Sequence, residues 1–266
     1  MGNTCCGCLS SEKDSYSYEY NSRTPLLGAQ VSVPESRAAT KENVSSARRY
    51  RPPEDSRQFE SSIEAVTTIE TLPVPVSSVD KTFKDQAKRY NDLVETYSNL
   101  RTEIHNFKTY FEEETSGIPV LQDCFRILVR RCGDAKITID RKSKTLLYVS
   151  FNQKDVTEKC TVTPEQALKP LEHYQNACKY AGDVLHHAPH IKDSISIIIN
   201  DEKAMRREIT KADLPGEKGV DAMKAVMSNI TNLKQMKVNI DTIQKYADNT
   251  FKELLEASRN FFASNC

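Results

Sequence analysis

The sequence has no tryptophan, only 8 glycines among 266 residues, and no long apolar run. A transmembrane helix needs about 20 consecutive apolar residues, whereas the apolar stretch Ser194–Ile199 is short and flanked by charged residues. The apolar segment of a secretory signal peptide is also missing near Met1. We therefore expect no membrane-spanning segment, so any attachment to a membrane must be covalent or peripheral.

An excess of either charge is missing as well, because 37 Lys and Arg residues balance 37 Asp and Glu residues. Proteins that bind nucleic acids concentrate positive charge, so we expect no nucleic-acid partner. The sequence also lacks the G-x-x-x-x-G-K-[ST], G-x-S-x-G and H-E-x-x-H motifs of common enzyme sites. We therefore predict a protein that is not an enzyme and that needs no cofactor.

The 8 cysteines have neither the density nor the spacing of a secreted disulfide scaffold. Three crowd together at the N-terminus, and the others are scattered: Cys124, Cys132, Cys160, Cys178 and Cys266. No Cys or His pair elsewhere has the spacing that a zinc site would require. We interpret the cysteines as reduced thiols of a protein that faces the cytosol, without a metal site.

The first residues, Met1-Gly-Asn-Thr-Cys-Cys-Gly-Cys8, contain the parts of a double acylation signal. Myristoylation uses Gly2 after removal of Met1 and usually has Ser or Thr at position 6, where this sequence has the similarly sized Cys6. A myristoyl chain alone binds membranes marginally, so palmitoylation of Cys5, Cys6 and Cys8 would make the anchor stable. Residues 1–10 resemble the acylated N-termini of Src-family kinases and Gα subunits, which implies anchoring alone.

Residues 11–78 are rich in Ser, Glu, Pro, Thr and Arg and show no sustained apolar period. Such a segment cannot bury enough apolar surface to offset its ordering entropy, so we predict a long disordered tether. Within it, an acidic and serine-rich run contains three candidate phosphorylation sites, Tyr16, Tyr18 and Tyr20. The alternative is that these tyrosines reflect composition alone.

A second short pattern in the tether, Ser22-Arg-Thr-Pro-Leu-Leu27, resembles the dileucine sorting signals that clathrin adaptors bind. The resemblance implies that Leu26 and Leu27 form the recognised pair. Ser22 replaces the usual acidic residue four positions before the first leucine, and its phosphorylation would restore the negative charge. The alternative is an ordinary exposed pair of leucines.

From residue 79 to residue 266 we expect a mainly α domain, an elongated antiparallel helical bundle with a small β-hairpin at about residues 136–151. Apolar residues at steps of three and four predict a first helix of about 35 residues. These residues are Phe83, Ala87, Tyr90, Val94, Tyr97, Leu100, Ile104, Phe107 and Phe111. A second, shorter helix is predicted to end near Cys132-Gly133.

The second half of the domain has clear start and stop signals for two more long helical regions. Thr163-Pro-Glu-Gln166 predicts a helix start with Thr163 as N-cap and Gln166 completing a capping box. Leu214-Pro-Gly216 is a break, after which the apolar period predicts a final helix of about 40 residues.

The cluster His186-His187-Ala-Pro-His190 lies between these signals. His186 and His190 would share one face of a continuous helix. Pro189, however, disfavours the helical conformation at Ala188, so we predict a polar turn between helices rather than a metal site.

Together these patterns favour a myristoylated and palmitoylated peripheral membrane adaptor or scaffold in membrane trafficking or signalling. The acyl chains would hold it on the cytoplasmic face of an endosomal, lysosomal or plasma membrane, and the bundle would bind protein partners. Two alternatives stay open: a membrane-shaping module similar to BAR domains, and a coiled-coil subunit of a tethering complex. Apolar stripes on long helices leave homo-oligomers and hetero-oligomers equally open.

Overall fold

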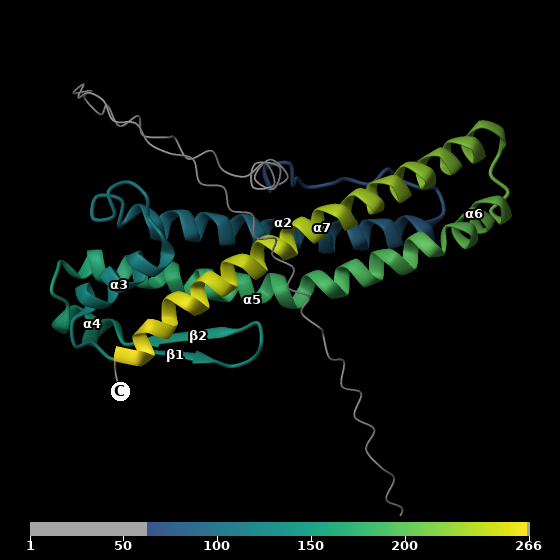
Figure 1. Cartoon of the computed structure of the whole chain (residues 1–266). Helices are drawn as coiled ribbons and strands as arrows, with labels where there is room; N and C mark the ends of the chain where they lie inside the picture. Colours follow the sequence, from purple (N-terminus) through teal and green to yellow (C-terminus); the bar gives the residue numbers. More distant parts are fainter. Residues whose placement is uncertain (1–62, 265–266) are drawn as a thin grey trace, which may run out of the picture. The chain divides into compact units, whose positions relative to one another are not determined.

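A computed structural model describes residues 63–264, except for the side chains of residues 260–264. The chain divides into two units, and the described residues all belong to the second, Arg51–Cys266. Its elements (Figure 1) are α2 (Ser77–Thr109), α3 (Leu121–Cys132), β1 (Ile137–Arg141), β2 (Leu147–Phe151), α4 (Gln153–Lys159), α5 (Pro164–Asn200), α6 (Glu202–Lys211) and α7 (Gly216–Ser264). The prediction of a mainly α protein with a small antiparallel hairpin is confirmed.

Helices α2 and α5 pack along each other in opposite directions. Gln86 Nε2 donates to Ser194 Oγ at 2.8 Å, while further along α2 the Glu103 carboxylate lies 2.6 Å from His173 Nδ1. Residues later in α2 thus contact residues earlier in α5, so the two helices are antiparallel. The apolar stripe predicted for α2 faces this contact, and its aromatic residues are fully buried.

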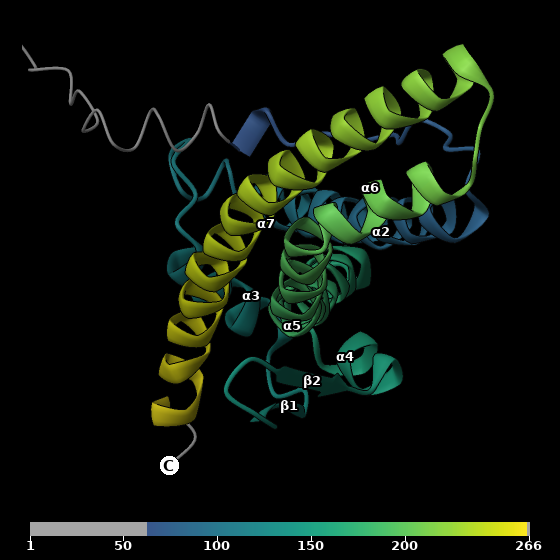
Figure 2. The same ribbon diagram turned by 90° about the vertical axis from the view of Figure 1, so that its right-hand side faces the viewer.

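Helix α7 packs on α5, again in the opposite direction. The buried Tyr174 hydroxyl donates to Leu254 O at 2.8 Å near the end of α7, and Lys192 forms an ion pair with Asp241 nearer its middle. Both views show α7 crossing obliquely over the other helices, with α3 beside its C-terminal half (Figures 1 and 2). The shared core is lined by large buried side chains from all three long helices: Phe83, Tyr90, Leu100, Phe107, Leu171, Tyr174, Ile195, Leu233 and Met236.

Helix α5 runs without interruption through Pro189, so the predicted turn at His186–His190 is wrong. A proline inside a helix removes one backbone hydrogen bond and costs about 3 kcal/mol. Val184, Ala188 and Ile195 on the same helix have no exposed surface. Burying the side chains of Val184 and Ile195 stabilises the fold by about 1.5 to 3 kcal/mol each, so tertiary packing outweighs the local preference of proline.

The β-hairpin lies on the side of α5 away from α2, as both views show (Figures 1 and 2). Its register pairs Ile139 with Val149, and both residues are buried. Gly182 of α5 allows the close approach: a Cβ atom at this position would lie only 3.1 Å from Thr145 O and 3.0 Å from Leu146 Cδ1. A glycine inside a long helix is therefore explained by the hairpin that packs on it.

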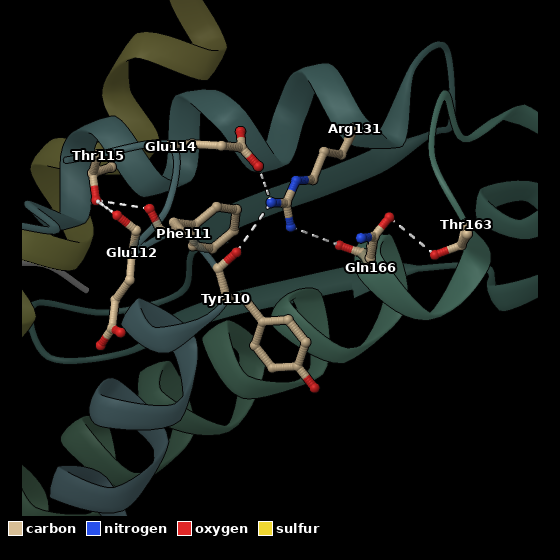
Figure 3. Close-up of polar contacts among 8 residues, drawn as sticks. All are labelled: Tyr110, Phe111, Glu112, Glu114, Thr115, Arg131, Thr163 and Gln166. Carbon is tan, nitrogen blue, oxygen red and sulfur yellow. Dashed lines mark hydrogen bonds and ion pairs between the residues drawn. The ribbon is translucent and has the colours of Figure 1, made fainter. Parts of the chain in front are cut away.

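The side chain of Arg131, 10% exposed, joins the end of α2, the end of α3 and the start of α5 (Figure 3). Its guanidinium donates to Tyr110 O at 3.0 Å and to Gln166 O at 3.2 Å, and it forms an ion pair with Glu114. It also lies 4.6 Å from the centre of the Phe111 ring, within range of a cation–π interaction. The planar, multiply donating guanidinium suits this position, because it can satisfy several acceptors at once.

The start of α5 departs in detail from the predicted capping box. Thr163 is the N-cap and Pro164 the first helical residue, as predicted. The Thr163 hydroxyl, however, donates to Gln166 Oε1 at 3.0 Å and does not accept from a backbone N–H. The two side chains therefore bind each other, while the Gln166 backbone carbonyl accepts from Arg131 (Figure 3).

The predicted disordered tether extends too far, because its last part is ordered. Residues 63–76, which we call the strap, include a short helical turn and an extended segment that contacts α2 and α7. Ile63 and Val74 of the strap are buried, and Val66, Ile69 and Val76 pack against the core. These apolar residues, separated by threonine, glutamate and proline, bury enough surface to order a segment whose composition favours disorder.

Candidate functional site

The predicted lipidation, phosphorylation and sorting residues lie outside the part of the chain that the structure describes. They are Gly2, Cys5, Cys6, Cys8, Tyr16, Tyr18, Tyr20, Ser22, Leu26 and Leu27. Their roles therefore stay predictions. Three features of the described residues are candidates for function.

The first feature is the way two asparagine side chains bind the strap. Asn229 of α7 accepts a hydrogen bond from Leu72 N at 2.7 Å and donates one to Leu72 O at 2.8 Å. Asn91 of α2 accepts from Ile69 N at 3.0 Å and donates to Ile69 O at 3.2 Å. Each amide thus binds both backbone groups of one residue, as a neighbouring β-strand would, and does so whatever side chain that residue carries.

Two tyrosine hydroxyls extend this contact toward the start of the strap. Tyr90 donates to Thr67 O at 2.8 Å and accepts from Asn239 Nδ2 at 2.6 Å, while Tyr97 donates to Ile63 O at 3.3 Å. Burial raises the pKa of Tyr90, and it raises the pKa of Tyr97 to about 12. Both hydroxyls therefore keep their protons at neutral pH, as their role as donors requires.

The strap also fixes where the N-terminal residues join the helical domain. It runs back along α2, from Ile63 beside Tyr97 to the start of the helix at Ser77 (Figure 1). Tyr97 packs edge to face on Tyr246 of α7, with ring centres 5.4 Å apart. The described chain thus begins beside the middle of α2, near α7, rather than at an end of α2.

Sequence reasoning missed the strap because its binding residues look ordinary in sequence. Asn91 and Asn229 lie inside amphipathic helices, where a single asparagine is common on a polar face. One signal was available in the sequence: Asn229 lies next to the apolar stripe of α7. In the structure, Asn229 has no exposed surface. A buried amide requires partners, and here the partners come from a segment 157 residues away.

The second feature is a pocket of about 470 Å³ between α2 and α5. Its polar lining residues are Arg89, Asp92, Thr96, Asp183, His187 and His190. The histidines reach it because α5 is continuous through Pro189. Within residues 63–264 no group of three His, Cys, Asp or Glu side chains is arranged to hold a metal ion. The pocket lining offers hydrogen-bonding groups and charges of both signs.

The third feature is a row of exposed apolar side chains on α7, which we call the α7 stripe. It consists of Val220, Met227 and Val238, each at least half exposed. Their spacings of 7 and 11 residues place them on one face of the helix, because a turn takes 3.6 residues. Helices present such rows to other helices, so the α7 stripe is a candidate for binding a partner.

Comparison with protein-family models, curated proteins and solved structures finds no match for this chain. Among the described residues, no helix is both long enough and apolar enough to cross a membrane.

Proposed function

We propose that this protein is a peripheral membrane adaptor or scaffold, myristoylated at Gly2 and palmitoylated at Cys5, Cys6 and Cys8. The single observation that carries the proposal is the N-terminal octet, in which the requirements of both acyl groups occur together. Two lipids are needed because one myristoyl chain gives only marginal binding. The helical domain then presents surfaces to protein partners in trafficking or signalling at the cytoplasmic face of an endosomal, lysosomal or plasma membrane.

The folded part of this adaptor is an elongated antiparallel bundle. In support, the contacts of α5 with α2 and with α7 both run in opposite directions along the paired helices. Helix α7 has 49 residues and would extend about 70 Å at 1.5 Å per residue. Such a helix can hold binding surfaces far from the point where the chain meets the membrane.

The strap gives the bundle a defined attachment to its anchor. A flexible arm of about 60 residues has a root-mean-square span of about 45 Å, shorter than α7. Ile63, where the described chain begins, lies beside Tyr97, which packs on Tyr246 of α7. Val220 and Met227 of the α7 stripe precede Tyr246 by 26 and 19 residues, which is about 30 to 40 Å along the helix, so a partner bound there is well separated from the start of the strap.

The partner that fits the α7 stripe is an amphipathic helix of another protein. The row of Val220, Met227 and Val238 is narrow and follows the helix axis, which suits a second helix lying alongside it. Lys224 and Asp221, both exposed, flank its start. An occupant with an apolar seam and charges of both signs beside it would match this surface.

Localisation tests the anchor. The intact protein should be at membranes, Gly2→Ala should be largely cytosolic, and the triple variant Cys5/Cys6/Cys8→Ser should exchange rapidly between membrane and cytosol, because one acyl chain remains. Metabolic labelling with myristate and palmitate analogues checks each modification directly. If both variants stayed as firmly bound as the wild type, the anchor would not be lipid and the proposal would fail.

The partner surface has its own test. A triple variant, Val220/Met227/Val238→Glu, is compared with Ile118→Glu, which changes an exposed apolar residue in the loop after α2. Proximity labelling at the membrane should lose a defined set of neighbours in the triple variant only, with localisation unchanged. An unchanged set would exclude the α7 stripe as the partner surface while leaving the anchor untouched.

A further inference from the structure

The end of α3 and the residues after α4 lie directly side by side. Thr161 N donates to Arg131 O at 2.8 Å, and the Thr161 hydroxyl donates to Arg130 O at 3.0 Å. Two residues after Arg131, a Cβ atom built on Gly133 would lie only 2.3 Å from Lys159 O. Only glycine permits so close an approach of two backbones, and its φ of 60° adds a second reason for glycine.

These contacts determine which residues oppose each other. Arg131 contacts Thr161 and Gly133 contacts Lys159, so Cys132 and Cys160 lie between the two contacts, one on each segment. Cys132 is the last residue of α3 and Cys160 directly follows α4. The two thiols are near enough for Cys160 to influence the charge of Cys132. Disulfides span Cα separations of about 4.4 to 6.8 Å, and the backbone contacts on both sides of the pair hold the two segments at close range.

The two thiols differ in exposure. Cys132 is 1% exposed, whereas Cys160 is half-buried and reaches the surface, with Sγ 3.0 Å from Val162 O. Burial first, and the neighbouring Cys160 second, raise the pKa of Cys132 to about 11. A soluble oxidant therefore reaches the Cys160 thiol first, and the buried Cys132 thiol reacts only with the oxidised Cys160 sulfur beside it.

We propose that Cys132 and Cys160 form a reversible disulfide when the protein meets a peroxide. The Cys160 sulfur attacks one peroxide oxygen, so that an S–O bond forms, the O–O bond breaks and water leaves with the thiol proton. The Cys132 sulfur then attacks the Cys160 sulfur. The S–S bond forms, the S–O bond breaks, and a second water carries away the Cys132 proton. Two thiols and one peroxide thus give one disulfide and two waters.

The bond closes a loop of about 28 residues that contains the β-hairpin and α4. It joins the end of α3, which packs on α7, to the segment leading into α5. The disulfide would hold this end of the domain closed beside the Arg131 contacts, and a thiol reductant would release it. The inference does not depend on the lipid anchor.

The experiment treats the purified full-length chain with a small excess of hydrogen peroxide, followed by alkylation and peptide mapping without reduction. The chain carries Ser at Cys5, Cys6, Cys8 and Cys266, so that the four described thiols are the only ones present. We expect one cross-linked peptide pair, Cys132 with Cys160. The melting temperature should rise by about 5 to 10 °C and return to its original value after reduction.

Cys160→Ser should lose both the cross-link and the shift in melting temperature, and Cys132→Ala should leave Cys160 as a sulfenic or sulfinic acid. Cys124→Ser, which alters another buried cysteine of α3, should keep both. The parent chain is the one that carries Ser at Cys5, Cys6, Cys8 and Cys266 only. The inference is wrong if Cys160 of the parent chain is oxidised beyond sulfenic acid without any Cys132–Cys160 cross-link. It is also wrong if the cross-link forms without a rise in melting temperature. Mapping of the parent chain decides the matter even if a variant folds poorly.

Discussion

Replacing Asn229 by alanine removes the amide that binds both backbone groups of Leu72. Each hydrogen bond contributes about 1 kcal/mol net. Leu72 is 49% exposed, whereas Asn229 has no exposed surface. In the variant, water can bind the backbone groups of Leu72 at the surface, but it cannot occupy the buried place of the Asn229 amide. We therefore expect Asn229→Ala to lower the free energy of unfolding by about 2 kcal/mol.

Urea unfolding followed by circular dichroism measures this loss, with an expected fall in midpoint of about 1 M for a domain of this size. Hydrogen exchange gives the local result: the Leu72 amide should lose about 30-fold protection, since 1.4 kcal/mol corresponds to a factor of ten. The matched control is Asn232→Ala, whose amide makes one exposed hydrogen bond to Glu70 O at 3.0 Å and should cost less than about 0.5 kcal/mol. Equal losses in the two variants, or an unchanged exchange rate at Leu72, would refute the reasoning.

Four further substitutions test other contacts. Gly182→Ala should destabilise the protein by about 1 kcal/mol or more despite the higher helix propensity of alanine, because its Cβ would crowd a hairpin carbonyl. Gly219→Ala, where a Cβ atom would lie no closer than 3.4 Å to another atom, should instead stabilise the protein by up to about 1 kcal/mol. Thermal unfolding measures both glycine variants. Arg131→Met should cost about 3 kcal/mol in urea unfolding, because two carbonyls and a carboxylate lose their donor; a loss below about 1 kcal/mol would contradict the role given to the guanidinium. Hydrogen bonds from Lys84, and secondarily from the backbone N–H of Val74 in the strap, hold the pKa of Asp80 below its usual value. The Asp80 carboxylate therefore stabilises the folded protein at neutral pH, and this stabilisation is lost as the pH falls below about 4. Urea midpoints at pH 7 and pH 3 should therefore differ less in Asp80→Asn than in the wild type, and an equal difference would exclude this carboxylate.

The sequence predicted the helices whose signals are local and repeated. The apolar period from Phe83 to Phe111 predicted α2 closely, and Leu214-Pro-Gly216 predicted the break before α7. Runs of β-branched and aromatic residues on either side of a polar turn were enough to predict the hairpin. In each case, the signals that determine the element lie within the element itself or directly next to it in the sequence.

Features that depend on distant residues could not be predicted in this way. The turn expected at Pro189 is replaced by a continuous helix, because the combined burial of side chains such as Val184 and Ile195 outweighs the local cost of proline. The strap is ordered by Asn229, which is 157 residues away. The opposition of Cys132 and Cys160 likewise follows from how α3 and α4 fold together.

The path of the strap has a mechanical consequence under the proposed N-terminal anchor. Tension on residues 1–62 would act first on Ile63, the end of the strap farthest along the chain from Ser77. A pull away from α2 loads the strap's hydrogen bonds one after another, as in unzipping, whereas a pull along the helix axis loads them together in shear. Peeling the strap would add roughly 45 Å of extended chain while α2, α5 and α7 stay folded. We expect the strap to act as a force-sensitive extension, yielding before the helices and docking again when the tension falls.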